Sequence, residues 1–254
     1  MACAKNSQTN AALYSTFSSI QYKAGCSFLE TLNLKLGDKV LDMGCGTGEL
    51  TKYIAERVGH DGEVVGVDPD HTRIKVAHEN MTVPNASFHT GRSESGFPND
   101  NQAYYDLHFS NHVFHWLNDE DKAAYVKVAF NCLKSGGVIA VQCLAKPDDD
   151  INNRFIESAL STSLSPKCHF AEEGSARELL HDVGFTHVDV KIIPSVCYYS
   201  SFEVYSKGFL AAACTDISEL ADKALLEEFK MKSIEKDGRV KSKYNLFQIK
   251  GRKS

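Results

Sequence analysis

Residues 40–48 read Val-Leu-Asp-Met-Gly-Cys-Gly-Thr-Gly, and this stretch decides the fold of the 254-residue chain. An apolar run from Lys39 to Met43 leads into three glycines spaced G-x-G-x-G, and a helical pattern follows from Leu50 to Val58. An apolar run, a glycine turn and a helical pattern in this order predict a β-strand, a tight turn and an α-helix.

The same alternation continues toward the C-terminus. Residues 63–68 form a β-branched run that ends on Asp68, and Asp70 is placed to cap the helix that follows. Further strands are predicted at residues 86–90, 105–110 and 138–143, with a helix at about 120–133 between the last two. Strands that alternate with helices predict an α/β fold: a Rossmann-like, doubly wound, mostly parallel sheet.

The two ends of the chain complete this prediction. Residues 22–36 have helical spacing and would form a lead-in helix. After a polar break at 146–150, residues 154–164 and 203–231 look helical, and two late strands at 188–193 and 244–250 would pair antiparallel at the sheet edge. The expected result is a seven-stranded sheet with an antiparallel edge strand and a helical cap.

Composition excludes several classes of protein. The net charge of -5 and a pI near 6.1 give no basic footprint for nucleic acid. The eight cysteines form no C-x-x-C pair, which favours reduced thiols, and we find no secretion signal or apolar membrane span. We therefore expect a cytoplasmic monomer or homodimer that acts on a small molecule, with no nucleic-acid or membrane partner.

The glycine turn lies where ligands bind in an open parallel sheet, beyond the carboxyl ends of the strands. Gly44 and Gly46 let the backbone turn tightly and approach a ligand, and Gly48 permits close packing where the helix starts. A dinucleotide fold usually shows G-x-G-x-x-G instead, with a pyrophosphate at the helix N-terminus. A dehydrogenase is therefore disfavoured, although a βα turn without a ligand has the same local pattern.

Acidic residues flank this turn. Asp42 precedes the first glycine and Glu49 opens the helix, so a pyrophosphate would be repelled and a zwitterionic amino acid would not. Asp68 ends the second strand 20 positions after Gly48, where an acid in nucleotide folds accepts hydrogen bonds from the ribose hydroxyls. The pattern favours a cationic amino-acid nucleoside.

These residues resemble motif I and the following acidic motif of class I methyltransferases, and Leu133-Lys-Ser-Gly-Gly137 is similar to the family's L-K-P-G-G loop. The resemblance implies S-adenosyl-L-methionine as cofactor, S-adenosyl-L-homocysteine as product and no metal. It implies a single domain over residues 1–254, with 1–145 as the cofactor-binding half and 146–254 as the cap and edge strands that shape the substrate pocket. The implied cofactor contacts are Asp42, Gly44, Cys45, Gly46, Gly48, Asp68, Pro69, Arg92, Ser93, Asn111 and His112.

One part of the cofactor site departs from the family. At the end of the third strand the family often has an acid that faces the adenine amino group, and residues 90–94 here contain no Asp. In one interpretation Arg92 stacks on the adenine and Ser93 forms a hydrogen bond with it. In the other, both are solvated loop residues.

A second resemblance concerns the methyl acceptor. His115-Trp116 after the fourth strand, Leu13-Tyr14 with Gln21 near the N-terminus, and residues 179–185 resemble juvenile hormone acid methyltransferases and, more distantly, trans-aconitate methyltransferases. The resemblance implies that Gln21 and Trp116 orient the substrate carboxylate, with His115 as a further hydrogen-bond donor. A carboxylate has a pKa near ~4, so it is ionised at neutral pH and needs no general base.

Other interpretations remain open. Trp116 could be a core residue and Gln21 a surface residue, while His108, His112 and His115 alternate through the strand end and so do not favour a metal cluster. The aromatic residues after 165 would line an acyl pocket or form the core of the cap: Phe170, Phe185, Tyr198, Tyr199, Phe202, Tyr205 and Phe209. The alternative functions are small-molecule N-methylation of an amine, C-methylation of a quinone or sterol, and a catalytically silent cofactor-binding partner.

Overall fold

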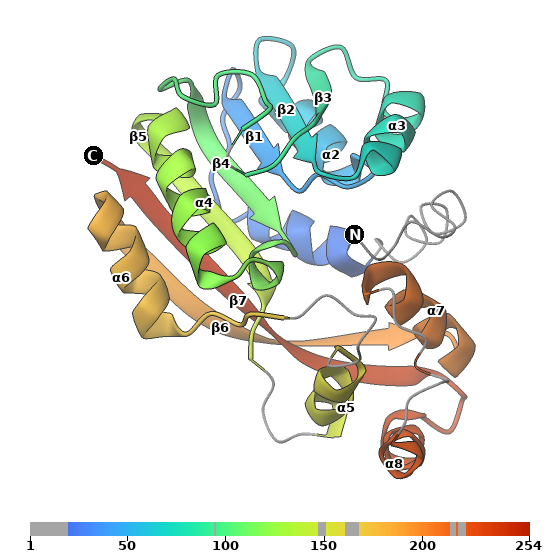
Figure 1. The fold of residues 1–254 in the computed structure, drawn as a ribbon. Helices are drawn as coiled ribbons and strands as arrows, with labels where there is room; N and C mark the ends of the chain where they lie inside the picture. The colour runs from blue at the N-terminus through green and yellow to red at the C-terminus, as the bar shows by residue number, and fades with distance from the viewer. Residues whose placement is uncertain (1–19, 94, 147–150, 161–167, 214–216, 218–221) are drawn as a thin grey trace.

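Seven strands form one sheet in the computed structural model, which describes residues 20–93, 95–146, 151–160, 168–213, 217 and 222–254. A helix at residues 20–29 precedes the elements labelled in Figure 1. Those elements are β1 (Lys39–Met43), α2 (Glu49–Val58), β2 (Glu63–Asp68), α3 (His71–Asn80), β3 (Ala86–Thr90), β4 (Tyr105–Asn111), the 3-10 turn η1 (Phe114–Trp116), α4 (Asp119–Cys132), β5 (Leu133–Leu144), α5 (Ile151–Leu160), α6 (Glu173–Val183), β6 (Phe185–Tyr199), α7 (Phe202–Ala213), α8 (Lys223–Ser233) and β7 (Val240–Lys253).

The strand order is β3-β2-β1-β4-β5-β7-β6, and neighbours from β3 to β5 pair in parallel. The chain moves outward from β1 to β3 and then returns to β4 on the other side of β1, so the order reverses between β1 and β4. The prediction of a doubly wound, mostly parallel sheet is confirmed. The two late strands are also confirmed: β7 lies between β5 and β6 and is antiparallel to both.

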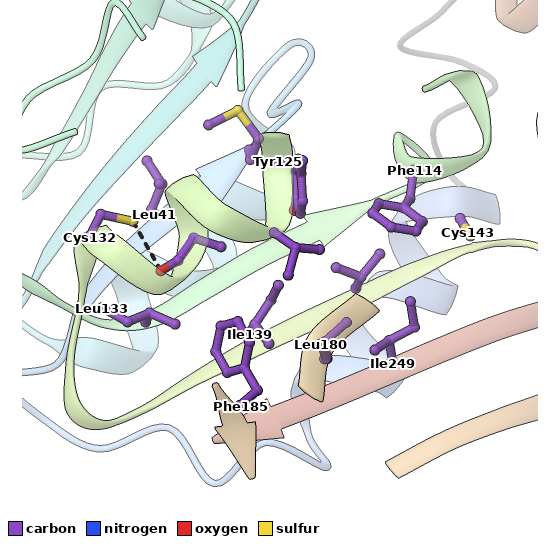
Figure 2. Close-up of a cluster of buried hydrophobic side chains, with 14 of the residues drawn as sticks. Leu41, Phe114, Tyr125, Cys132, Leu133, Ile139, Cys143, Leu180, Phe185 and Ile249 are labelled. Atoms are coloured by element: carbon purple, nitrogen blue, oxygen red, sulfur yellow. Dashed lines mark hydrogen bonds between the residues drawn. The ribbon is translucent and has the colours of Figure 1, made fainter. Parts of the chain in front are cut away.

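Both faces of the parallel strands are covered, because β1 and β2 are buried along almost their whole length. On one face, Phe28 and Leu29 of helix 20–29 pack with Ile54 of α2 against the sheet. On the other face, α4 and α6 cover the larger core. Figure 2 shows that core, in which Tyr125 of α4 and Leu180 of α6 face Ile139 of β5 and Ile249 of β7.

A second, smaller core lies where the long strands β6 and β7 extend past the other strands, among α5, α7 and α8 (Figure 1). Phe155 of α5 stacks on Phe229 of α8 with ring centroids 4.1 Å apart, and Tyr205 of α7 stacks on the same ring at 5.1 Å. Val240 at the start of β7 belongs to this cluster. The helices of the predicted cap therefore share a core with the sheet's own strands.

The structure assigns most of the aromatic residues whose role the sequence left open. Tyr199, Phe202 and Tyr205 belong to or pack against the smaller core, and Phe185 lies in the larger one. Tyr198 is exposed on β6, so it is not a core residue. Phe170 is half-buried; the side chain of Phe209 lies outside the described part of the chain.

The helices differ from the prediction in their extent. The lead-in helix, predicted over 22–36, covers only 20–29, because the chain turns at Thr31 and Leu32 and Asn33 then takes a left-handed conformation with φ 53. The predicted helix at 203–231 is two helices, α7 and α8. Within the described residues, no helix has the length and apolar character that crossing a bilayer requires.

Candidate cofactor and substrate site

The glycine turn lies at the carboxyl end of β1, beside the point where the strand order reverses. Gly44 has φ +81, and a Cβ there would lie 2.1 Å from Cγ2 of Val113. Gly48 has φ +91, and its Cβ would meet the ring of Phe88 at 2.9 Å. Both positions require glycine, one because the loop after β4 approaches closely and the other because α2 starts against β3.

Asp68 holds this turn from the end of β2. Its carboxylate accepts a hydrogen bond from the backbone N–H of Gly46 at 3.1 Å and another from the N–H of Asp70 at 2.9 Å. The Asp70 side chain in turn accepts from Thr72 N, so the predicted cap of α3 is confirmed. Each carboxylate oxygen can accept more than one bond, so Asp68 retains acceptor capacity for a ligand.

Three carboxylates lie around the turn. Asp42 is buried and receives a hydrogen bond from the Thr51 hydroxyl at 2.6 Å, while Glu49 receives one from the Thr47 hydroxyl at 2.7 Å. Burial, helped by the charges of Asp68 and Glu49, raises the pKa of Asp42 to about 7. Burial also raises the pKa of Asp68. The positive charge of Arg73 opposes this rise at Asp68. Asp42 and Glu49 each receive a hydrogen bond from a neutral hydroxyl, so this side of the turn suits a positive charge.

A cavity opens between this turn and helix 20–29. Its lining residues are Gln21, Tyr22, Asp42, Gly44, Cys45, Glu49, Leu50 and Asn111. The Asn111 side chain donates a 3.1 Å hydrogen bond to the backbone oxygen of Gln21 and so links the end of β4 to the helix. The structure thus brings Gln21, predicted for the acceptor side, together with Asp42, Gly44, Cys45 and Asn111, predicted for the cofactor.

Beyond Asn111, three aromatic side chains follow one another. The rings of His112 and His115 lie 6.1 Å apart, and His115 lies 4.5 Å from Trp116. Burial lowers the pKa of His112 to about 4 and that of His115 well below its usual range. Both imidazoles are therefore neutral at pH 7. Trp116 is half-buried and leans on His115, outside the residues that line the cavity.

A later segment of the chain covers this row of rings. The backbone N–H of His169 donates to the carbonyl of His115 at 2.8 Å, and the ammonium of Lys122 donates to the carbonyl of His169 at 2.7 Å. Lys122 is buried although it is charged. No local pattern predicts this contact, because it joins α4 to a segment 47 residues away.

The remaining predicted contacts lie apart from the cavity. Pro69 and Arg92 are exposed, and Ser93 is half-buried in a tight turn that Arg92 closes with Ser95. Gly46 belongs to the glycine turn itself. Leu13 and Tyr14 lie outside the described residues. Exposure of Arg92 does not decide between the two predicted roles, so an adenine contact by Arg92 or Ser93 stays a prediction.

Of the three histidines, only His108 belongs to β4. His108 faces α4, where its Nδ1 lies 3.3 Å from the hydroxyl of Tyr125, while His112 and His115 lie beyond the strand end. Among the described residues, no three His, Cys, Asp or Glu side chains are grouped to hold a metal ion.

Sequence reasoning missed several residues of the site. Tyr22 and Leu50 line the cavity. Glu49 lines it too; the sequence predicted that its charge favours a zwitterionic ligand but did not include it among the cofactor contacts. Tyr22 follows Gln21 directly in the predicted lead-in helix, but a single sequence does not tell which side of that helix faces a ligand. Gln142 of β5, which bonds Asn111, was not predicted at all.

Comparison with known proteins agrees with this geometry. Residues 40–137 match the family model of a methyltransferase domain. The chain is 25% identical to juvenile hormone acid O-methyltransferase of Bombyx mori over 87% of this chain and 83% of that protein. It is 31% identical to trans-aconitate 2-methyltransferase of Methylobacterium radiotolerans over 54% of this chain and about half, 51%, of that relative.

The matched domain and these relatives support a class I S-adenosylmethionine-dependent methyltransferase. The fold of this chain is similar to that of Haemonchus contortus phosphoethanolamine N-methyltransferase 2 solved with S-adenosyl-L-methionine: the TM-score is 0.66 at 17% identity, covering 96% of this chain and 57% of that one. Enzymes named for oxygen and for nitrogen acceptors thus share this fold, and the fold does not choose between them.

Proposed function

We propose that this methyltransferase transfers the methyl group to the oxygen of a small carboxylic acid and forms a methyl ester. The observation that carries the proposal is the state of the two histidines beyond Asn111. With pKa values of about 4 for His112 and well below the usual range for His115, neither accepts a proton at neutral pH. An ammonium group would need such an acceptor before it could react, and an ionised carboxylate would not.

The site residues fit S-adenosylmethionine. Asp42 and Glu49 would face its positive charges, Asp68 would bond the ribose, and the turn at Gly44 to Gly48 would lie against it without a Cβ in the way. When bound, this cofactor supplies an electrophilic methyl group on a sulfonium. Cys45, Asn111 and His112 complete the proposed contacts, while Pro69, Arg92 and Ser93 are proposed for the adenosine end on resemblance alone.

The acceptor side is proposed to consist of Gln21, His115 and Trp116. The Gln21 amide and the Trp116 indole N–H are neutral donors, so they orient a carboxylate oxygen without neutralising it. His115 packs on the indole and fixes its position. Catalysis would then come from alignment of the oxygen and from exclusion of water by the rings of His115 and Trp116, not from proton transfer.

One structural observation favours the alternative, N-methylation of an amine. Asp42 lines the cavity, and its pKa of about 7 would let it accept a proton near neutral pH. In that case the acceptor amine would have to reach Asp42 beside the cofactor's own ammonium. This competition of two cations for one carboxylate makes the carboxylic acid the better proposal.

The two functions give chemically different products. The protein is incubated with methyl-labelled S-adenosylmethionine and separate panels of carboxylic acids and amines, and the products are treated with mild base. Label that base releases as methanol indicates methyl esters. Label that stays on an amine contradicts the proposal, and no transfer to either panel would favour a cofactor-binding protein without catalysis.

A further inference from the structure

Three amide side chains lie in a row across the sheet behind the cavity. Asn111 of β4 pairs with Gln142 of β5, and Gln142 pairs with Gln248 of β7, so the three positions are direct neighbours in register. They lie on the face that helix 20–29 covers, where the preceding layers are apolar. Gln142 is fully buried. A buried amide is costly unless its polar atoms are bonded, so its partners define its role.

The hydrogen bonds in this row all run in one direction. Gln248 Nε2 donates to Gln142 Oε1 at 2.7 Å, Gln142 Nε2 donates to Asn111 Oδ1 at 2.9 Å, and Asn111 Nδ2 donates to the backbone oxygen of Gln21 at 3.1 Å. If the Gln142 amide were reversed, oxygen would face oxygen on one side and nitrogen would face nitrogen on the other. The backbone oxygen of Gln21 can only accept, so it faces the Asn111 nitrogen and leaves Asn111 Oδ1 to the Gln142 amide; with that end fixed, the three amides bond one another in this one order.

The same residue also fixes the backbone beyond the strand. The carbonyl of Gln142 accepts a 2.7 Å hydrogen bond from the backbone N–H of His112. His112 has φ 60, a backbone conformation that residues other than glycine rarely adopt. Gln142 thus bonds Asn111 through its side chain and His112 through its main chain. These are the two residues that connect the cofactor turn with the row of rings.

Helix 20–29 rests on the other end of the row. A Cβ on Gly25 would lie 3.1 Å from the Asn111 amide nitrogen and 2.6 Å from Cδ1 of Leu50, so the helix approaches both closely. The bond from Asn111 to Gln21 is a polar tie between this helix and the sheet. This hydrogen bond forms only when the Asn111 amide nitrogen faces the helix.

We propose that Gln142 and Gln248 are positioning residues for cofactor binding: their amides orient Asn111, and through it hold helix 20–29 closed over the cofactor cavity. The proposal rests on the cofactor part of the proposed function and not on the acceptor. Its test therefore needs only S-adenosylmethionine, and a failure would leave the choice between acid and amine untouched.

The test replaces the amides by a side chain of similar length that cannot donate or accept in this way, Gln142→Met and Gln248→Met. We expect Gln142→Met to weaken S-adenosylmethionine binding about tenfold by calorimetry and to speed hydrogen exchange of residues 21–29 about tenfold, with exchange of β2 unchanged. Because the bonds act in series, the double variant should differ from Gln142→Met by less than about twofold.

The matched control is Asn85→Leu, which removes an amide that bonds Ala55 O and Gly59 O at the opposite end of the sheet. It should lower the melting temperature without changing cofactor affinity or exchange at 21–29. If the control produces the same changes, or if Gln142→Met leaves both quantities within about twofold of the unchanged protein, the proposal is wrong. Should Gln142→Met not fold, Gln248→Met decides by the same two measurements, since Gln248 is only half-buried.

Discussion

The hydroxyl of Thr51 on α2 donates a 2.6 Å hydrogen bond to the carboxylate of Asp42 at the end of β1. This is a single neutral donor for a fully buried anion, and the nearby charges of Asp68 and Glu49 oppose ionisation further. The pKa of Asp42 therefore lies at about 7 in the protein without cofactor. A cation bound beside Asp42 would favour the ionised form and lower that pKa.

Cofactor binding should consequently depend on pH. We expect affinity for S-adenosylmethionine to rise between about pH 5.5 and pH 7.5 and to approach a tenfold change per pH unit at the acid end, with proton release on binding. Calorimetry in two buffers of different ionisation enthalpy measures both effects. Asp42→Asn should bind more weakly at pH 7.5 and lose the slope, whereas Asp106→Asn, at the opposite end of β4, should keep it.

Stability without cofactor should depend on pH in the opposite sense. The pKa of Asp42 is raised from 3.8 to about 7, so its protonated form stabilises the fold fully below the lower value, and this contribution disappears as pH rises through the higher one. The melting temperature of Asp42→Asn minus that of the unchanged protein should therefore grow from about pH 5 to about pH 8. A difference that is constant with pH would contradict the raised pKa.

The glycine turn allows a matched comparison of two substitutions. Gly44 and Gly136 both have φ +81, but only at Gly44 would a Cβ collide, 2.1 Å from Val113. Alanine at either position should cost about 1 kcal/mol of backbone strain. Gly44→Ala should cost at least a further ~1–3 kcal/mol and abolish measurable cofactor binding. Equal losses in chemical denaturation and intact binding for both variants would refute the close approach.

Trp116→Phe tests the proposed acceptor side. The ring that packs on His115 is kept, while the indole N–H is lost. We expect S-adenosylmethionine affinity to stay within about twofold and turnover of the accepted acid to fall roughly 10- to 100-fold, the scale of one lost orienting bond. Tyr198→Phe, an exposed aromatic on β6, serves as the control. If cofactor affinity collapses with Trp116→Phe, the tryptophan is structural.

Phe229→Ala tests the proposal that residues 1–254 form a single domain. Phe229 lies at the centre of the smaller core, and β7 runs from that core into the larger one. We expect a loss of about 3–5 kcal/mol in one cooperative unfolding transition, while Met231→Ala, 84% exposed on the same helix, should change stability by less than about 0.5 kcal/mol. Two separate transitions, with only one shifted by Phe229→Ala, would show independent units.

Short-range patterns were enough for most elements. Short apolar and β-branched runs placed β1 to β5 within a residue or two at most boundaries. Asp70 was identified as a cap because capping depends on neighbours in sequence. The lead-in helix was predicted too long because helical periodicity continues past Thr31, while the Thr31 hydroxyl bonds the carbonyl of Phe28 at 2.7 Å and the chain turns there. Such local competition between side chain and backbone is invisible in a periodicity count.

The sequence by itself determined the cofactor half of this protein: three glycines, the acids Asp42, Glu49 and Asp68, and the order of strands and helices specify a turn that fits a cationic nucleoside. These features are local, and each strand end in a parallel sheet delivers its residues to the same edge. Only the tertiary structure decided the protonation of Asp42, His112 and His115, because desolvation depends on everything packed around a group. The tertiary structure alone revealed the row of amides from Gln248 to Asn111. Gln142 and Gln248 are 106 residues apart in the sequence, so no local pattern predicts that their strands pair in this register.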